Sequence, residues 1–194
     1  YDWALNVYET GAREAYGTLA ATMQSYDCLC VGQLNLYGMQ GDSSVTRKPL
    51  LAPSPVPEVN SNEIPKVMDT DDIAQVIAGF TFGAQLLAEA GLDGVEINAG
   101  QFSLLRQFLS GLTNFRSDAY GGSLEKKCRL LLEVLQAVRK VLGKEHILGL
   151  RLCGDEYAPW GGIQPEEAKE IAAYLTSQVE LDYLAVETGS IYSV

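Results

Sequence analysis

Four segments of the chain are apolar over most of their length and are predicted to be β-strands. They are residues 28–35, 93–98, 146–153 and 181–188. Their apolar residues follow one another instead of alternating with polar ones, which is typical of strands that are buried on both faces. Such strands belong to a parallel sheet that is covered by helices.

Four longer segments alternate with these strands and carry the marks of helices. The predicted helices are residues 3–24, 69–91, 123–143 and 164–178. Ser123 stands at the start of the third, Pro165 lies in the first turn of the fourth, and a glycine closes the second and the third. The proline-rich passage at 52–59 is predicted to be a loop, because proline cannot donate to a regular ladder.

The strict alternation of strand and helix predicts an α/β fold. Two architectures satisfy it, a doubly wound open sheet and part of a TIM (β/α)8 barrel, and the lack of a Gly-x-Gly-x-x-Gly after any predicted strand favours the barrel. A closed barrel takes about 250 residues. About four parallel β/α units in 194 residues therefore predict a single domain, residues 1–194, that is the central half of a barrel. We expect the other half to come from sequence outside these residues or from a partner chain, including a second copy of this chain.

Composition narrows the class of partner. The formal net charge is −11, so most of the surface would repel nucleic acid and anionic membranes. No segment approaches the ~18 consecutive apolar residues of a membrane-spanning helix. We therefore expect a small-molecule substrate, and neither nucleic acid nor a membrane as partner.

The cysteines and the histidine give no sign of a metal site. The four cysteines are Cys28, Cys30, Cys128 and Cys153, with neither a C-x-x-C pair nor a zinc spacing. They are predicted to be reduced, structural thiols of a cytoplasmic protein. His146 is the single histidine, which excludes a histidine dyad. No metal ligand is predicted.

Two carboxamides follow the second predicted strand. Asn98 ends this strand, whose buried run begins at Gly94, and Gln101 comes three residues later in the sequence VEINAGQF. Both candidate architectures place their reactive groups at the carboxyl ends of the strands. Because a carboxamide can donate hydrogen bonds to an oxyanion, Asn98 and Gln101 are candidate site residues.

A long motif follows in residues 107–129, QFLSGLTNFRSDAYGGSLEKKCR. It closely resembles the pattern Q-F-L-S-x-x-x-N-x-R-x-D-x-Y-G-G-S-x-x-N-R-x-R of the flavin-dependent old yellow enzyme family. Arg116 and Asp118 are predicted to pair, and Ser123 to cap the next helix. We interpret the motif as scaffold that identifies the family and does not carry its chemistry.

The resemblance covers nearly the whole chain and implies an FMN site. In VGQLNLYGMQ, Gln33 matches the glutamine that hydrogen-bonds the pyrimidine edge of the flavin. In GLRLC, Arg151 matches an arginine beside flavin N1, where a fixed guanidinium stabilises the negative charge of the reduced ring. A structural ion pair of Arg151 with Asp155 or Glu187 is the alternative.

The same resemblance assigns roles to the two amides. Typical relatives carry His-x-x-His or His-x-x-Asn at the positions of Asn98 and Gln101, next to the flavin, and these side chains hold the substrate carbonyl. A tyrosine two residues later delivers a proton. Ser103 occupies its position here, and a serine is far too weak an acid to replace a phenol.

The resemblance implies an FMN-dependent oxidoreductase that passes hydride from NAD(P)H through flavin to an activated C=C bond. An amine dehydrogenase or demethylase of the trimethylamine dehydrogenase-like branch is one alternative. A half-barrel without catalytic activity, serving as an interaction subunit, is another.

Overall fold

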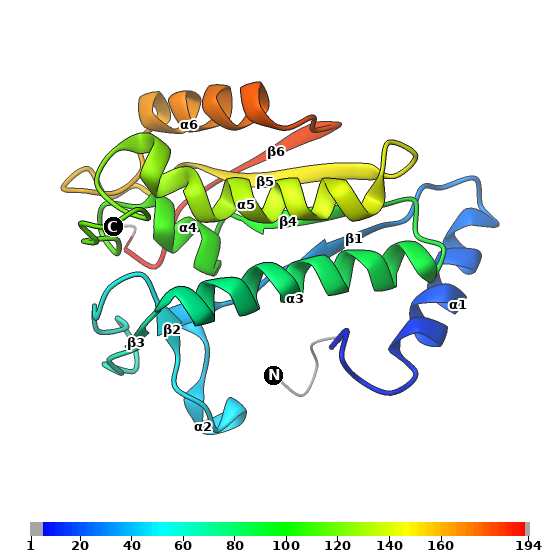
Figure 1. Cartoon of the computed structure of the whole chain (residues 1–194), viewed down its shortest axis with the longest axis horizontal. Coiled ribbons are helices and arrows are strands. Elements are labelled where there is room, and N and C mark those ends of the chain that lie inside the picture. Colours follow the sequence, from blue (N-terminus) through cyan, green and yellow to red (C-terminus); the bar gives the residue numbers. More distant parts are fainter. Residues whose placement is uncertain (1–5, 193–194) are drawn as a thin grey trace.

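The fold is built on a parallel sheet of four strands, shown in Figure 1 as a computed structural model that describes residues 6–192. The strands lie in the order β1 (Val31–Leu34), β4 (Gly94–Ala99), β5 (Ile147–Asp155) and β6 (Tyr183–Thr188). All three pairings are parallel, and the spatial order follows the chain without a reversal among the described strands. A barrel has this order, whereas a doubly wound sheet reverses direction at its switch point.

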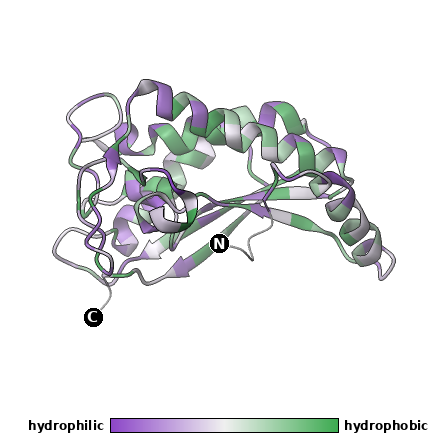
Figure 2. Cartoon of the chain, turned by 90° about the horizontal axis from the view of Figure 1, so that it is seen from below, coloured by the Kyte–Doolittle hydropathy of each residue, from purple (hydrophilic) through white to green (hydrophobic). Residues whose placement is uncertain are grey.

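Three helices form a layer against one face of the sheet. They are α3 (Thr70–Glu89), α5 (Leu124–Leu142) and α6 (Pro165–Gln178). The helix α1 (Ala12–Gln24) packs against α3 near the edge at which the strands begin (Figure 1). Figure 2 shows the helical layer on one side of the strands. The core joins side chains from both, such as Leu87 and Leu131 from the helices and Ile97 and Leu150 from the strands.

The first helix is shorter than its apolar pattern predicts. In the structure α1 begins at Ala12. The residue before it, Gly11, has a left-handed backbone with φ 85°, so the helix does not extend towards the N-terminus beyond this point. Residues 6–11 form turns instead of the predicted helix, and residues 3–5 of that prediction lie outside the described residues.

Several short elements were absent from the sequence prediction. The largest is α4 (Leu104–Leu109), in which all six residues are buried. Its two polar residues, Arg106 and Gln107, are buried along with its four apolar ones, so the helix has no exposed polar face. A helix that is buried on all sides shows no amphipathic period, and its sequence therefore gives no helical signal. The remaining short elements are η1 (Gly38–Gln40), α2 (Ser43–Thr46), β2 (Leu51–Ala52) and β3 (Lys66–Val67). Ala52, predicted as loop, thus belongs to a two-residue strand.

The strands present different side chains to the two faces of the sheet. In β4, Val95 and Ile97 join the core beneath the helices, so the alternating residues Glu96 and Asn98 point to the opposite face. We call this opposite face the polar face. It carries Gln33, Glu96, Asn98, Arg151, Tyr183 and Glu187.

The prediction that every strand is buried on both faces is wrong for β6. Leu184 and Val186 of this strand are 39% and 67% exposed. β6 is the edge of the described sheet, and the last described helix, α6, packs against β5, so these two side chains lie beyond the cover of the helical layer.

Arg116 and Asp118 of the motif loop form the predicted pair. Arg116 Nη2 lies 2.5 Å from Asp118 Oδ2, and Arg116 Nη1 donates to the carbonyls of Met68 and Pro53 at 2.8 and 3.2 Å. The arginine therefore ties the motif to the segment that contains β2 and β3. Ser123 is the N-cap residue of α5, but its hydroxyl donates to Glu125 and makes no cap hydrogen bond.

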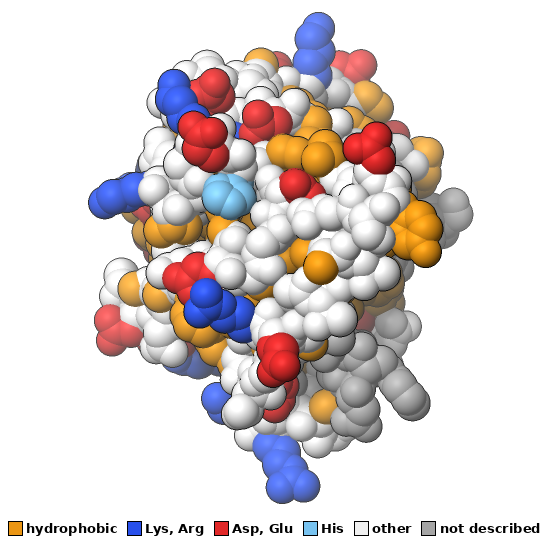
Figure 3. All heavy atoms as spheres, turned by 90° about the vertical axis from the view of Figure 1, so that its right-hand side faces the viewer, with side chains coloured by type: hydrophobic (Ala, Val, Ile, Leu, Met, Phe, Trp, Pro, Cys, Tyr) orange, Lys and Arg blue, Asp and Glu red, His pale blue; other side chains and the backbone are white. Residues whose placement is uncertain are grey.

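Two aspartates hydrogen-bond to backbone amides at the edge of the sheet where the strands begin. Asp93 accepts from the amide of Cys30 at 2.7 Å, and Asp182 accepts from the amide of Leu148 at 2.8 Å. Figure 3 looks onto this edge, where His146 is visible. His146 precedes β5 and thus lies at the opposite end of the sheet from the residues that follow the strands.

Acid is expected to weaken the fold through these two carboxylates. Backbone amide donors hold the pKa of Asp93 and of Asp182 below the usual range. Each contributes stability above an unfolded pKa of about 3.9 and loses it as the pH falls through the lower folded value. Urea unfolding at pH 7 and pH 3 should show a smaller loss of stability for Asp93→Asn and Asp182→Asn than for the wild type. Asp27→Asn, on an exposed turn, is the control, and a loss equal to the wild type's in the first two variants would contradict the assignment.

Candidate functional site

One row of residues crosses all four strands on the polar face. The strand register pairs Gln33 with Glu96, Glu96 with Gly149, and Gly149 with Tyr183. Gln33 Nε2 donates to Glu96 Oε1 at 2.7 Å, and the Tyr183 hydroxyl donates to Glu96 Oε2 at 3.0 Å. The carboxylate of Glu96 is therefore held from both sides, in a residue that is only 5% exposed.

Gly149 makes the contact between Tyr183 and Glu96 possible. A Cβ atom at this position would collide with the Tyr183 ring, whose Cζ, Cε1 and hydroxyl are its three nearest atoms. The tyrosine of β6 thus lies across the bare backbone of β5 and reaches a carboxylate on β4. A glycine in a strand often marks such a close approach.

Arg151 lies two residues beyond this row, towards the carboxyl end of β5. Its Nε donates to Glu96 Oε1 at 2.9 Å, and its Nη1 lies 3.6 Å from Glu187 Oε2. The ion pair with Glu187 that the sequence left open is present. Glu96 is a second and closer partner that the sequence reading did not identify.

These contacts fix the protonation states of the donors. The hydrogen bond to Glu96 raises the pKa of Arg151 above its ordinary value. Burial, followed by the hydrogen bond to Glu96, raises the pKa of Tyr183 to about 12. Both groups therefore keep their protons at neutral pH, and Glu96 faces two permanent donors from β5 and β6.

The structure separates the two amides that the sequence grouped together. Asn98 is in register with Arg151, and its Oδ1 accepts from the Gly100 amide at 2.8 Å. Within the described residues, Asn98 Nδ2 makes no hydrogen bond. Gln101 Nε2, by contrast, donates to the carbonyl of Thr188 at 2.8 Å, and the Gln101 amide donates to Glu187. Asn98 therefore has an Nδ2 group that no described residue binds, at the end of β4. Gln101 instead joins the segment after β4 to the end of β6.

Ser103 has a structural position. It is fully buried and is the N-cap residue of α4, accepting from the Leu105 amide at 3.1 Å. Its hydroxyl donates to the carbonyl of Asn98 at 2.6 Å. The resemblance places Ser103 at the position of the family's proton-donating tyrosine, but here both hydrogen-bonding roles of its hydroxyl serve the backbone.

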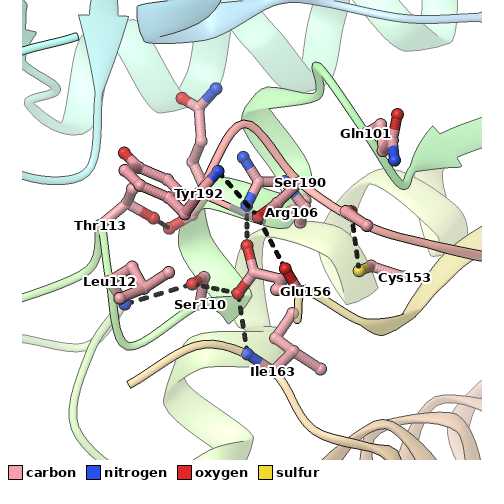
Figure 4. A network of polar contacts seen from close by, with 12 residues as sticks. Gln101, Arg106, Ser110, Leu112, Thr113, Cys153, Glu156, Ile163, Ser190 and Tyr192 are labelled. Atoms are coloured by element: carbon pink, nitrogen blue, oxygen red, sulfur yellow. Dashed lines mark hydrogen bonds and ion pairs between the residues drawn. The ribbon is translucent and has the colours of Figure 1, made fainter. Parts of the chain in front are cut away.

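A buried ion pair connects α4 to the segment that follows β5, as Figure 4 shows. Arg106 of α4 pairs with Glu156, which follows β5, and both side chains are completely buried. Arg106 Nη2 also donates to Gln40 at 3.1 Å, and Glu156 Oε2 accepts from Ser110 Oγ at 2.5 Å and from the Ile163 amide at 2.8 Å. Burial lowers the pKa of Arg106. The pair joins η1, α4 and the segment after β5.

The residues present fit the pyrimidine edge of a flavin. Within the described residues, Gln33 Oε1 and Arg151 Nη2 make no hydrogen bond, and both side chains lie on the polar face. An amide oxygen and a guanidinium offer an acceptor and donors to a ring edge that displays N–H and C=O groups. FMN is thus compatible with the donors and acceptors of this face.

Comparison with known proteins decides the family. The sequence profile of the NADH:flavin oxidoreductase / NADH oxidase family matches residues 1–193. The chain belongs to this family. This membership confirms the resemblance on which Gln33 and Arg151 were singled out, and it confirms FMN and NAD(P)H as the cofactors of the family.

Two relatives of the chain are named for different activities. The chain is 40% identical over 137 residues to an N,N-dimethylglycine/sarcosine dehydrogenase of Chromohalobacter salexigens, covering 71% of this chain and 20% of that protein. It is 32% identical over 190 residues to an NADPH dehydrogenase of Clostridium acetobutylicum, covering 98% and 55%. The chain therefore spans between a fifth and about half of these relatives.

Solved structures confirm the fold class. A 2-naphthoyl-CoA reductase in complex with 2-naphthoyl-CoA superposes with a TM-score of 0.90 at 26% identity, covering 97% of this chain and 30% of that one. Morphinone reductase in complex with tetrahydroNAD gives 0.83 at 26% identity, covering 93% and 55%. Neighbours of this kind are TIM barrels of old yellow enzyme type, and the sheet described here is part of such a barrel.

Two negative findings apply to residues 6–192. No helix in this part of the chain is both long and apolar enough to cross a membrane. In the same residues, no group of three or more histidine, cysteine, aspartate or glutamate side chains is arranged to hold a metal ion.

Proposed function

We propose that the complete protein is an FMN-dependent oxidoreductase that passes hydride from NADH or NADPH through the flavin to an activated C=C bond, such as that of an enone or enoyl thioester. One observation carries this proposal. Asn98 and Arg151 are in register on neighbouring strands, and each keeps donors that no described residue uses. Family membership supports the cofactor, and the free donors support a substrate with a carbonyl oxygen.

The chain's own residues would bind the flavin and polarise the substrate. FMN, when bound, accepts hydride from the nicotinamide and delivers it to the substrate. Gln33 and Arg151 would hold the pyrimidine side of the ring, with the guanidinium stabilising negative charge there. Asn98 Nδ2 would donate to the substrate carbonyl oxygen, where negative charge develops as hydride arrives at the alkene.

Gln101 and Ser103 would act through Asn98. Gln101 fixes the end of β4 against β6, and Ser103 holds the Asn98 carbonyl. Both contacts restrict the position of the Asn98 side chain. We therefore propose them as positioning residues and assign proton delivery to neither.

Amine oxidation is a second candidate, and Glu187 favours it. This carboxylate lies at the carboxyl end of β6, with its Oε2 3.6 Å from Arg151 Nη1, where it would attract a cationic amine. Gly100 leaves room for it, since a Cβ atom there would collide with the Glu187 carboxylate. Relatives named for dimethylglycine/sarcosine dehydrogenase and N-methylproline demethylase activity support this reading.

The direct test uses the full-length purified protein. Its visible absorption shows whether flavin is bound, and anaerobic mixing with NADH or NADPH shows whether that flavin is reduced. Reoxidation of the reduced flavin by an enone supports alkene reduction. Bleaching of the oxidised flavin by a secondary or tertiary amine supports the second candidate. A full-length protein that carries no flavin contradicts both.

Replacing Asn98 with alanine is expected to weaken phenol binding to the flavoprotein by about 10- to 150-fold. Phenolates imitate a developing enolate, and a lost charge-assisted hydrogen bond costs about 1.5–3 kcal/mol. The long-wavelength charge-transfer band between phenolate and flavin reports the binding. Flavin content should be nearly unchanged.

Gln101→Ala is the matched control, because the amide it removes is already bonded to Thr188. It is expected to change phenol binding by less than about fivefold, since it alters only the support of Asn98. Equal losses in the two variants would contradict the separation of their roles.

A further inference from the structure

Glu96 is the residue on which the polar face converges. It accepts hydrogen bonds from Gln33 of β1, Arg151 of β5 and Tyr183 of β6, at 2.7, 2.9 and 3.0 Å. Two of these three donors are the residues that the proposed function places against the flavin. The third comes from the far edge of the sheet. A single carboxylate thus links all four strands of the main sheet.

We propose that Glu96 is the positioning residue of the flavin site, that it fixes the orientation of Gln33 and Arg151, and that it reduces the positive charge that Arg151 presents to the ring. This inference rests on the proposed function. Glu96 acts through its neighbours and is not proposed to react.

The orientation of Gln33 follows from the contact. A carboxylate only accepts hydrogen bonds, so Gln33 must turn its amide nitrogen towards Glu96. The oxygen of Gln33 is then directed to the open part of the polar face, where it can accept from an N–H group of the ring. A neutral amide at position 96 would accept or donate and would leave both orientations of Gln33 available.

The charge argument concerns Arg151. Its guanidinium is flanked by Glu96 at 2.9 Å and by Glu187 at 3.6 Å. A reduced flavin carries negative charge near N1, so a guanidinium whose charge is partly neutralised stabilises it less than an unpaired one. Glu96 therefore holds the flavin potential below the value that Arg151 alone would give.

Tyr183 controls how much charge Glu96 retains. Its hydroxyl donates to Oε2, the oxygen that Gln33 and Arg151 do not use, and it can do so because Gly149 has no side chain. Removing this donor leaves more of the carboxylate charge to act on Arg151. Substitutions at Glu96 and Tyr183 should therefore shift the flavin potential in opposite directions.

The test measures the midpoint potential of FMN in the intact flavoprotein and in three variants. E96Q keeps the shape and removes the charge, and it is expected to favour the reduced over the oxidised flavin by at least tenfold, which is about 30 mV upwards for a two-electron couple. Y183F is expected to shift the same ratio two- to threefold in the other direction. Neither change is expected from a residue that only stabilises the fold.

E133Q is the matched control. Glu133 on α5 accepts from the Tyr120 hydroxyl at 3.1 Å and from Arg129 Nε at 2.9 Å, which reproduces the tyrosine, carboxylate and arginine contacts within the helical layer. Its variant should leave the potential unchanged. An E96Q potential equal to that of E133Q, or lower than that of the wild type, overturns the proposal. If E96Q does not retain FMN, the midpoint potential of Y183F is the test. A Y183F potential that is not below the wild-type value overturns the proposal.

A second measurement separates this inference from the proposed function. In the FMN-free protein, a double-mutant cycle of E96Q and Y183F on urea unfolding should show coupling of at least threefold in the unfolding constant. Additive effects overturn the role of Glu96 whether or not flavin binds. If the wild-type protein binds no flavin but the coupling is strong, the proposed function is overturned. The contacts of Glu96 are then confirmed as structural, and its role at a flavin is overturned as well.

Discussion

Glu156→Ala is expected to lower the free energy of unfolding by about 3–5 kcal/mol, the largest effect on stability of any single change considered for this protein. The substitution leaves the guanidinium of Arg106 in a site with no exposure and without its anionic partner. It also leaves Ser110 Oγ and the Ile163 amide without their acceptor. Urea unfolding of the purified protein measures the effect.

Two comparisons sharpen this experiment. The double variant Arg106→Met with Glu156→Leu should be more stable than Glu156→Ala, because it removes both charges together. Glu180→Gln, which breaks the exposed contact between Lys144 and Glu180 at 3.7 Å, should cost no more than about 1 kcal/mol. If Glu156→Ala costs no more than Glu180→Gln does, the buried pair is not the support that the contacts indicate.

Arg151→Ala is expected to lower the FMN affinity of the complete protein by roughly 100- to 1,000-fold, on the order of 3–4 kcal/mol. The change removes the donors that would face the ring, and it leaves Glu96 and Glu187 as uncompensated negative charges beside it. The same charges disfavour the reduced flavin, so the potential of any flavin that remains bound should fall. Titration of the FMN-free protein with FMN, followed by fluorescence, measures the affinity.

Arg129→Ala is the control for this prediction. Arg129 lies on α5, pairs with Glu133 at 2.9 Å and stacks over Tyr120, on the helical side of the sheet. Its removal should leave the FMN affinity within about twofold of the wild type. Arg129 is half-exposed and lies on the other side of the sheet from the proposed flavin site, so solvent and salt screen its charge. Equal losses from Arg151→Ala and Arg129→Ala would show that the flavin does not contact the end of β5.

The sequence predicted long elements well and short ones badly. Strands such as residues 146–153 and helices such as residues 69–91 were found because several residues repeat one signal, either a continuous apolar run or a helical period with caps. The helix α4 was missed because burial on all sides removes the period. The paired segments β2 and β3 have two residues each, too few for any pattern.

The site residues divide in the same way. Gln33, Asn98 and Arg151 were found because each lies near the carboxyl end of a predicted strand and matches a family motif. Glu96 was missed, although its sequence signal was present as a charged residue inside the apolar run of β4. A buried charge needs partners, and these could have been sought on the neighbouring strands.

By itself, the sequence determined the alternation of four β/α units, the family, and which strand ends carry candidate chemistry, because these depend on local patterns and on a contiguous motif. Only the tertiary structure decided how the candidates are used. The row from Gln33 through Glu96 to Tyr183 depends on the register of three strand pairings. The pair of Arg106 and Glu156 joins residues 50 positions apart, and Gln101 turns to a carbonyl 87 positions away. Long-range pairing of the chain sets these contacts, and no local signal in the sequence encodes them.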